Sequence, residues 1–205
     1  MEKEKVDYRK MYHDLYSASA TNVHELVIPA LQFAMIDGKG KPETSQEFQS
    51  AIQALYGVSY TLKFGRKKAG LGPDYTIGPL EGLWWMKGGE DFDDTRPDDW
   101  RWTLMILQPD FISQEDFAKA VLELRTKKPN PALDSMILAT IDEGKAVQVM
   151  HIGPYDQEGP TIQRLQDYAR THDQSSRGKH HEIYLGNPSR SKPEKLRTIL
   201  RHPVG

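Results

Sequence analysis

The 205-residue chain contains no cysteine. This absence excludes disulfides, thiolate metal ligands and cysteine nucleophiles, and it is usual for proteins of the cytoplasm. No apolar run approaches the roughly 18 residues that a membrane-spanning helix needs. The N-terminal segment Met1–Lys5 is charged and no apolar segment follows it, so it is not a secretory signal. We therefore expect a cytoplasmic protein that makes no contact with membranes.

The chain also lacks an excess of charge of either sign. It has 27 lysines and arginines against 29 acidic residues, for a net charge of −2. Proteins that bind nucleic acid through phosphates carry a basic surface. The C-terminal basic segment 190–201 is interrupted by Glu194 and is typical of a solvated edge. We expect no direct binding of nucleic acid.

Several catalytic and cofactor motifs are missing. The sequence has neither a glycine-rich dinucleotide or phosphate loop nor a serine in a nucleophile elbow. His180, His181 and Glu182 are consecutive in a predicted strand, where neighbouring side chains point to opposite faces and cannot converge on one metal ion. The sequence therefore predicts neither a cofactor nor a metal site.

What the chain does have is a glutamate at the start of two apolar, aromatic segments. Glu81 lies in Pro79-Leu80-Glu81-Gly82-Leu83-Trp84-Trp85, and Glu182 lies in His181-Glu182-Ile183-Tyr184-Leu185. Carboxylates are rare in such surroundings, because a charge in a dry site is costly without a partner. Two of them among aromatic rings indicate a pocket for a flat or cationic organic molecule.

Hydrophobic periodicity predicts an α+β fold. Helices are expected behind the capping box at Thr44–Glu47, over Ser113–Arg125 and from Asp156 onward. The apolar stripe of the first of these helices includes Phe48, Leu55 and Leu62. Strands are expected near residues 31–37, 75–87, 100–107, 135–141, 145–152, 180–185 and 198–202, and the acidic stretch 88–99 is expected to be an exposed hairpin loop.

The order strand, helix, strand, strand occurs twice. We therefore expect a single domain over residues 1–205, with an N-terminal arm (1–22), a first module (23–109) and a second module (110–205). Each module alone would leave one sheet face bare. Two antiparallel modules related by a pseudo-twofold axis, with helices on one side, can enclose a ligand groove between the halves.

Strand alternation gives a first geometry for the glutamates. Glu81, Leu83 and Trp85 share one face of their strand, and Glu182, Tyr184 and His180 share a face of theirs. Aligning the two glutamates predicts that both carboxylates face the same groove. A partly desolvated glutamate has a raised pKa that suits proton transfer. The alternative is that both only accept hydrogen bonds from their neighbours.

Aromatic residues nearby leave further alternatives open. Tyr155 follows Gly153-Pro154 at a strand-to-helix junction, where its phenol could enter the groove or pack at the helix start. Trp102 could line the pocket or belong to the core. The sequence does not decide which of Trp84 and Trp85 faces the groove. Tyr56, Tyr60 and Phe64 follow one helix face and are expected in the core, and His151 is either structural or a proton shuttle.

These motifs resemble the GyrI-like small-molecule-binding family. The segments that carry the resemblance are Leu80–Trp85, Gly153–Tyr155, Glu182–Leu185 followed by Asn187-Pro188, and Thr44–Phe48 leading to Ala54–Tyr56. The first is specific for a stand-alone bacterial branch. The Glu-x-Tyr strand is also similar to effector-binding domains of multidrug-responsive transcription regulators. The chain lacks a winged helix-turn-helix segment, so we do not expect direct transcriptional control.

The resemblance implies a ligand groove between duplicated halves. In the regulators a glutamate in the position of Glu182 meets cationic aromatic drugs, and some stand-alone members are similar to hydrolases of cyclopropane-bearing, DNA-alkylating antibiotics. By resemblance Glu182 or Glu81, Tyr155, and Trp84 or Trp85 would carry the chemistry. Further ligand contacts are expected from Tyr184, Trp102 and Leu83.

We thus expect a protein that binds planar aromatic or cationic hydrophobic compounds and hydrolyses cyclopropane-bearing ones. Two alternatives are a protein that sequesters drugs without turnover and an interaction module that acts on a protein such as DNA gyrase. The natural ligand and the oligomeric state do not follow from the sequence.

Overall fold

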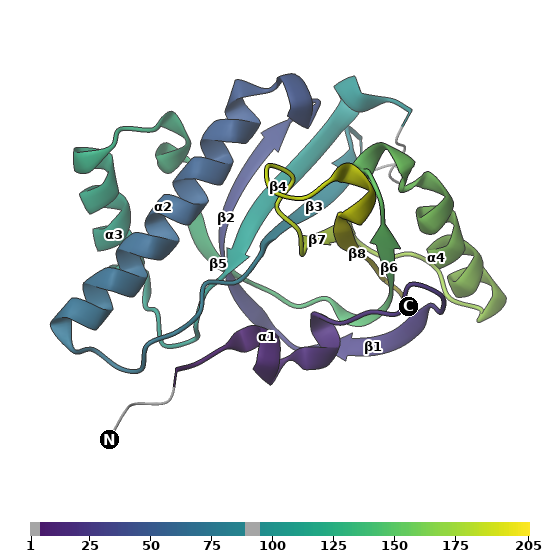
Figure 1. Ribbon diagram of the computed structural model, residues 1–205, viewed down its shortest axis with the longest axis horizontal. Helices are drawn as coiled ribbons and strands as arrows, with labels where there is room; N and C mark the ends of the chain where they lie inside the picture. Colours follow the sequence, from purple (N-terminus) through teal and green to yellow (C-terminus); the bar gives the residue numbers. More distant parts are fainter. Residues whose placement is uncertain (1–4, 89–94) are drawn as a thin grey trace.

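The computed structural model describes residues 5–88 and 95–205 (Figure 1). The strands are β1 (His24–Ile28), β2 (Leu31–Lys39), β3 (Leu80–Met86), β4 (Trp100–Leu107), β5 (Ile137–Ile141), β6 (Gly144–Ile152), β7 (His180–Tyr184) and β8 (Arg197–Pro203). The α-helices are α1 (Tyr8–Met11), α2 (Gln46–Ala69), α3 (Gln114–Lys127) and α4 (Gly159–Thr171). Short 3-10 turns include η1 (His13–Leu15) and η5 (Tyr155–Gln157).

All eight of these strands form one antiparallel sheet in the order β1-β6-β8-β7-β3-β4-β2-β5. The sheet curls into a half-barrel (Figure 1). The α+β class and the duplicated order predicted from the sequence are confirmed, because β2-α2-β3-β4 and β6-α4-β7-β8 repeat the same succession. The two sets of strands meet at the β3–β7 pair in the middle of the sheet.

Each half also receives one strand from the other. β1 precedes β2 in the chain but pairs with β6, and β5 precedes β6 but pairs with β2. The strand β1 was not predicted from the sequence. It is short, and four of its five residues are partly or fully exposed, as is usual for the edge of a sheet. These exchanged strands make the two halves interdependent.

The longer helices cover one face of the sheet. In β3 and β7 the register pairs Trp84 with His180 and Gly82 with Glu182, so these residues share a face. Trp84 packs with α2 in one apolar cluster, and Leu200, the partner of Glu182 in β8, packs with α4 in another. The opposite face carries Ile183, Ile199 and Met105 and is covered by the N-terminal arm through Leu15 and Tyr16.

The beginning of α2 differs by one residue from the expected capping box. The N-cap is Ser45, whose hydroxyl accepts a hydrogen bond from the amide of Phe48 at 3.1 Å. The helix ends at Gly70, whose φ of 68° lies in the left-handed region that glycine tolerates. Phe48, Leu55 and Leu62 are buried as predicted.

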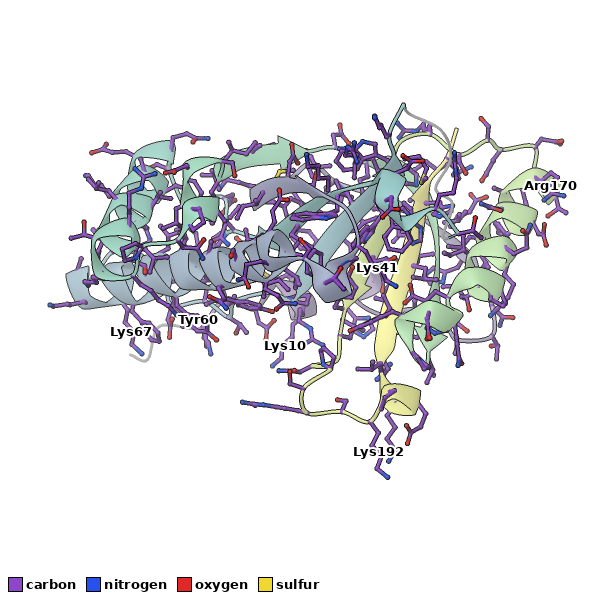
Figure 2. The ribbon with its side chains drawn as sticks, turned by 90° about the horizontal axis from the view of Figure 1, so that it is seen from above. Lys10, Lys41, Tyr60, Lys67, Arg170 and Lys192 are labelled. Carbon is purple, nitrogen blue, oxygen red and sulfur yellow. The ribbon has the colours of Figure 1, made fainter. Side chains whose placement is uncertain are left out.

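The aromatic residues on α2 were placed wrongly from the sequence. Tyr60 and Phe64 stack on each other with ring centroids 5.9 Å apart but are 48% and 56% exposed, and Tyr56 is only partly buried. Tyr60 and Lys67 lie on the outer side of the helix (Figure 2). An aromatic row at helical spacing therefore does not identify the buried face here.

Other element boundaries moved by a few residues. β3 begins at Leu80 rather than near residue 75, and the helix expected from Asp156 begins at Gly159 after the η5 turn. Half of the predicted acidic hairpin loop, residues 89–94, lies outside the described residues. In the described part of the chain, no helix combines the length and the apolar character needed to cross a bilayer.

Candidate functional site

Glu182 lies on the helical face of the sheet, near the middle, and is only 7% exposed. Its Oε1 is 3.1 Å from Nε2 of His180, and its Oε2 accepts a hydrogen bond from the hydroxyl of Tyr184 at 2.7 Å. The indole Nε1–H of Trp84 in turn donates to the hydroxyl oxygen of Tyr184 at 3.1 Å. The strand pairing brings these groups together across β3 and β7. The Glu182 carboxylate is thus held by His180 and Tyr184, and Tyr184 is itself held by Trp84.

A second imidazole sets the hydrogen-bonding state of His180. Nε2 of His202 in β8 lies 2.6 Å from Nδ1 of His180, with the two rings perpendicular. Burial, together with His180, lowers the pKa of His202 to about 3, so His202 is neutral at physiological pH. If its Nε2–H donates to Nδ1 of His180, the Nε2–H of His180 is directed to Glu182, and both ring nitrogens of His180 have a partner.

Glu158 brings a second carboxyl group to the same place. It stands at the N-cap of α4, is 4% exposed, and makes no hydrogen bond to the helix with its side chain. Burial and the neighbouring charge of Glu182 raise the pKa of Glu158 well above its ordinary value. Its Oε1 is buried without a hydrogen-bond partner among the described residues, and the nearby hydroxyl of Thr198 acts against the rise in pKa. Burial beside Glu182 thus favours the protonated form of Glu158 over the charged one.

Tyr155 is the most accessible aromatic residue of this cluster, at 38% exposure. Its ring meets that of Tyr184 edge-on, with centroids 5.7 Å apart. Burial and the nearby carboxyl groups of Glu158 and Glu182 raise the pKa of Tyr155 to about 12. Its phenol thus remains a hydrogen-bond donor over the physiological range. The predicted association of Tyr155, Glu182 and Tyr184 is present in the structure.

The turn that presents Tyr155 is held by His151. Its Nδ1 lies 3.1 Å from the hydroxyl of Thr161, and its Nε2 lies 3.1 Å from the carbonyl of Pro154. Gly153 adopts a φ of 145°, which non-glycine residues rarely adopt, and comes close to the His151 ring. Of the two readings left open by the sequence, this geometry fits a structural histidine.

Glu81 lies on the opposite face of the sheet, so the expectation that both glutamates face one groove is wrong. The register pairs Glu81 with Ile183 and Gly82 with Glu182. Aligning the two glutamates was therefore off by one residue, and a one-residue offset moves a side chain to the other face. The site that we describe contains Glu182 and not Glu81.

Leu83 and Trp85 share the face of Glu81, whereas Trp102 lies on the helical face beside Trp84 but belongs to the core. Leu83 is packed in the cluster under the N-terminal arm. The ammonium of Lys179 lies 3.4 Å from the centre of the Trp85 ring. Trp102 is fully buried and packs edge-on against Phe48 in the core. Among Leu83, Trp84, Trp85 and Trp102, the residue joined to Glu182 is Trp84, through the hydroxyl of Tyr184.

Glu81 belongs to a buried network that we call the arm network: Tyr16, Glu81, Glu143, Gln148, His181 and Arg201. His181 lies between two carboxylates, with Nε2 3.0 Å from Glu81 and Nδ1 2.9 Å from Glu143. Arg201 donates to the carbonyl of Leu15 at 2.6 Å, and Tyr16 donates to Glu81 at 2.9 Å. These bonds attach the N-terminal arm to the sheet.

His181 is charged in this arrangement. Both ring nitrogens face carboxylates, and only the imidazolium form can donate from both. Although burial acts against it, contact with Glu143 and Glu81 raises the pKa of His181. Burial also opposes the ionised form of Glu143, yet His181 and Arg201 lower the pKa of this carboxyl to about 2.

The arm network predicts a specific pH dependence of stability. The contribution of His181 is complete below its ordinary pKa of 6.5 and is lost as pH rises through the higher folded value. The contribution of Glu143 is present above 4.5 and is lost as pH falls toward about 2. The stability difference between the parent and His181→Gln should therefore be largest between these limits and shrink at alkaline pH. Urea unfolding over this range measures it, and a difference that grows with alkalinity would contradict a charged His181.

No cluster of three or more histidine, cysteine, aspartate or glutamate side chains suited to a metal ion occurs in the parts of the chain that the structure describes, 5–88 and 95–205. The Glu182 cluster instead combines two buried carboxyl groups, of which Glu158 favours its protonated form, with two phenols and two imidazoles. Such a set can complement a cation, exchange protons with a bound molecule, and donate hydrogen bonds to an oxygen that gains charge.

Comparison with known proteins gives a consistent result. Residues 21–204 match the family described as GyrI-like small molecule binding domain. An uncharacterized conserved protein from Listeria innocua is 36% identical over 98% of this chain and 100% of its own, with a TM-score of 0.90. A protein from Listeria innocua named as a hydrolase is 34% identical over the same shares, with a TM-score of 0.89. The chain matches no curated protein.

More distant solved structures share the fold alone. The C-terminal domain of EcmrR is 12% identical, covers 90% of this chain and 97% of its own, and has a TM-score of 0.54. The duplicated arrangement of strands is thus found well beyond the range in which the side chains of the site are comparable.

Proposed function

Because the chain belongs to the GyrI-like small-molecule-binding family, we propose that it is a hydrolase of hydrophobic small molecules, and that compounds with a cyclopropane conjugated to a carbonyl group are its substrates. The observation that carries the proposal is the Glu182 carboxylate, 7% exposed and held by Tyr184 and His180 next to the accessible phenol of Tyr155. The name hydrolase, borne by relatives that are 34% identical, supports it.

The reaction follows from the chemistry of these groups. Glu182 accepts a proton from water, whose oxygen forms a bond to a ring carbon of the cyclopropane. The strained carbon–carbon bond breaks, and its electron pair moves onto the conjugated carbonyl oxygen. Tyr155 donates a hydrogen bond to that oxygen as it gains negative charge. The oxygen then takes up a proton, Glu182 releases one, and the product is the substrate plus one water.

The rings of Tyr155, Tyr184 and Trp84 suit a flat substrate. Aromatic faces contribute apolar contact area without competing for hydrogen bonds. The negative charge of Glu182 also favours compounds that carry a positive group near a flat ring, so planar cations belong to the proposed ligand class. We place this activity in the cytoplasm, in keeping with the absence of cysteine.

The direct test uses the parent spirocyclopropyl-cyclohexadienone, whose ring opening by water gives tyrosol. Incubation with the protein should convert the dienone to tyrosol faster than buffer alone, as followed by mass spectrometry. In oxygen-18 water the new hydroxyl group should carry the label. Unchanged dienone after prolonged incubation, with binding intact, would reject hydrolysis of this class.

Tyr155→Phe should reduce kcat for the dienone by roughly 100-fold, the usual cost of one hydrogen-bond donor to a developing oxyanion. KM should change less, because the ring remains in place. Steady-state kinetics give both values. Tyr60→Phe is a matched control on the outer side of α2 (Figure 2) and should leave both constants unaffected. An equal decrease of kcat in Tyr155→Phe and Tyr60→Phe would show that Tyr155 has no role in the reaction.

A sequestering protein is the second candidate function. Both oxygens of Glu182 already accept hydrogen bonds, an arrangement that can hold a cation in place without activating water. In that case planar aromatic cations would bind, the dienone would return unchanged, and Glu182→Gln would weaken binding of the cation alone.

A further inference from the structure

Glu158 and Glu182 reach the site from different elements, Glu158 from the turn that leads into α4 and Glu182 from β7. Both are more than nine-tenths buried. Glu182 has donors on both oxygens, whereas Oε1 of Glu158 has none among the described residues. The donors of the site thus hold both oxygens of Glu182 and leave Oε1 of Glu158 without a partner. Two buried carboxyl groups in this position cannot both carry charge at low cost.

Three of the four other titratable groups that face this pair supply no positive charge. The four groups are Tyr155 of η5, Tyr184 and His180 of β7, and His202 of β8. Burial raises the pKa of both phenols and lowers that of His202, so these three stay neutral near pH 7. His180 uses one ring nitrogen toward Glu182 and the other toward His202. A proton on Glu158 therefore limits the negative charge of the site.

We propose that Glu158 and Glu182 hold a single proton between them, and that Glu158, as the group that keeps it, is a positioning residue for the hydrolysis at Glu182. This inference depends on the proposed function. The neutral Glu158 leaves Glu182 as the sole charged carboxylate, in the orientation set by Tyr184 and His180.

The charge of Glu158 affects the reaction itself. Glu182 takes up the proton from water, while negative charge develops on the carbonyl oxygen of the substrate. If Glu158 were ionised as well, its charge would oppose the developing oxyanion. Hydrolysis should therefore decline at low pH, where the pair takes up a second proton, and again at high pH, where the pair loses the proton that it shares.

The protonation state is measured without any substrate. Carbon-13 NMR of protein labelled at the glutamate carboxyl carbon reports the charge of each side chain, and Glu158→Gln identifies the Glu158 signal by its disappearance. At pH 7 Glu158 should give the signal of a neutral acid. In Glu182→Gln, where the neighbouring charge is gone, Glu158 should ionise at lower pH than in the parent. A Glu158 signal that titrates together with those of surface glutamates overturns the proposal.

The positioning role is measured on the rate of dienone opening as a function of pH. Glu158→Gln mimics the protonated acid permanently. Its rate near pH 7 should fall about tenfold, the cost of one weakened hydrogen bond, and its alkaline decline should disappear. Glu158→Leu, which lacks any polar group, should be slower than Glu158→Gln at every pH. The exposed Glu123→Gln on α3 is the matched control and should keep the parent profile.

The outcomes separate this inference from the proposed function. If Glu182→Gln keeps the full rate, the proposed function fails. If Glu182→Gln is inactive but Glu158→Gln keeps the alkaline decline of the parent, the function stands and the role of Glu158 is rejected. A purely structural role would lower the rate equally at all pH values and would not remove one limb of the profile.

Discussion

Glu182→Gln should lower kcat for the ring opening of the spirocyclopropyl-cyclohexadienone roughly 10²–10⁴-fold, the usual contribution of a general base. Glutamine has the size of glutamate but cannot accept a proton from water. It can still accept a hydrogen bond from Tyr184 or His180 through its single carbonyl oxygen, so the site should keep its shape. The initial rate of tyrosol formation measures the effect.

Glu81→Gln is the informative comparison, because Glu81 begins the equivalent aromatic strand but lies on the other face of the sheet. It should leave kcat close to that of the parent, provided that the assay temperature is below its unfolding midpoint. Its cost should appear instead in stability, since Tyr16 and His181 lose the charge that they contact. The opposite pattern, with Glu81→Gln inactive and Glu182→Gln active, would place the chemistry under the N-terminal arm.

Arg201→Met should destabilise the fold by about 3–5 kcal/mol, as expected when one partner of a buried ion network is removed. Arg201 is 2% exposed, and it contacts Glu143, Gln148 and the carbonyl of Leu15. Methionine replaces most of its apolar volume but none of its donors. The carboxylate of Glu143 would then depend on His181 alone, and the arm would lose its bond at Leu15.

The free energy of unfolding in urea measures this loss. Arg190→Met, at an exposed position of the loop after β7, should change stability by no more than about 0.5 kcal/mol. The comparison separates the charge network from the general effect of an arginine-to-methionine change. A loss below about 1 kcal/mol for Arg201→Met would mean that the arm is held by its apolar contacts and not by the network.

The succession of elements could be predicted from the sequence because it depends on local patterns. Period-two and period-3.6 repeats identified seven of the strands and the three longer helices. Ser113 and the capping box at Thr44–Glu47 indicated two helix starts, the second of them one residue before the observed cap Ser45. The strand β1 is too short to show such a pattern, and it is stabilised by pairing with β6. Its assignment requires the tertiary structure.

The face of each glutamate could not be predicted in the same way. The alternation of side chains shows which residues of one strand share a face. It does not show whether that face is the helical face of the sheet or the opposite one. The pairing of Gly82 with Glu182 decides it, and an alignment by residue type missed it by one position. Glu182, Tyr184 and Tyr155 could be predicted as one cluster because they belong to recognisable motifs.

The remaining charged residues of the Glu182 cluster and of the arm network had weaker sequence patterns. Glu158 follows Tyr155 by three positions, a spacing that puts two side chains on one side of a helical turn, and this was the signal available for it. Glu143 and Arg201 lie in an ordinary turn and an ordinary strand. Their importance arises from partners far away in the sequence, including Leu15 and His181.

The most direct test of our account is a crystal structure with the gem-dimethyl cyclohexadienone, which retains the flat dienone and has no ring to open. We expect the ligand on the helical face of the sheet, with its oxygen within hydrogen-bonding distance of the Tyr155 hydroxyl and its quaternary carbon toward Glu182. A ligand bound beneath the N-terminal arm, in contact with Glu81 and His181, would contradict the account.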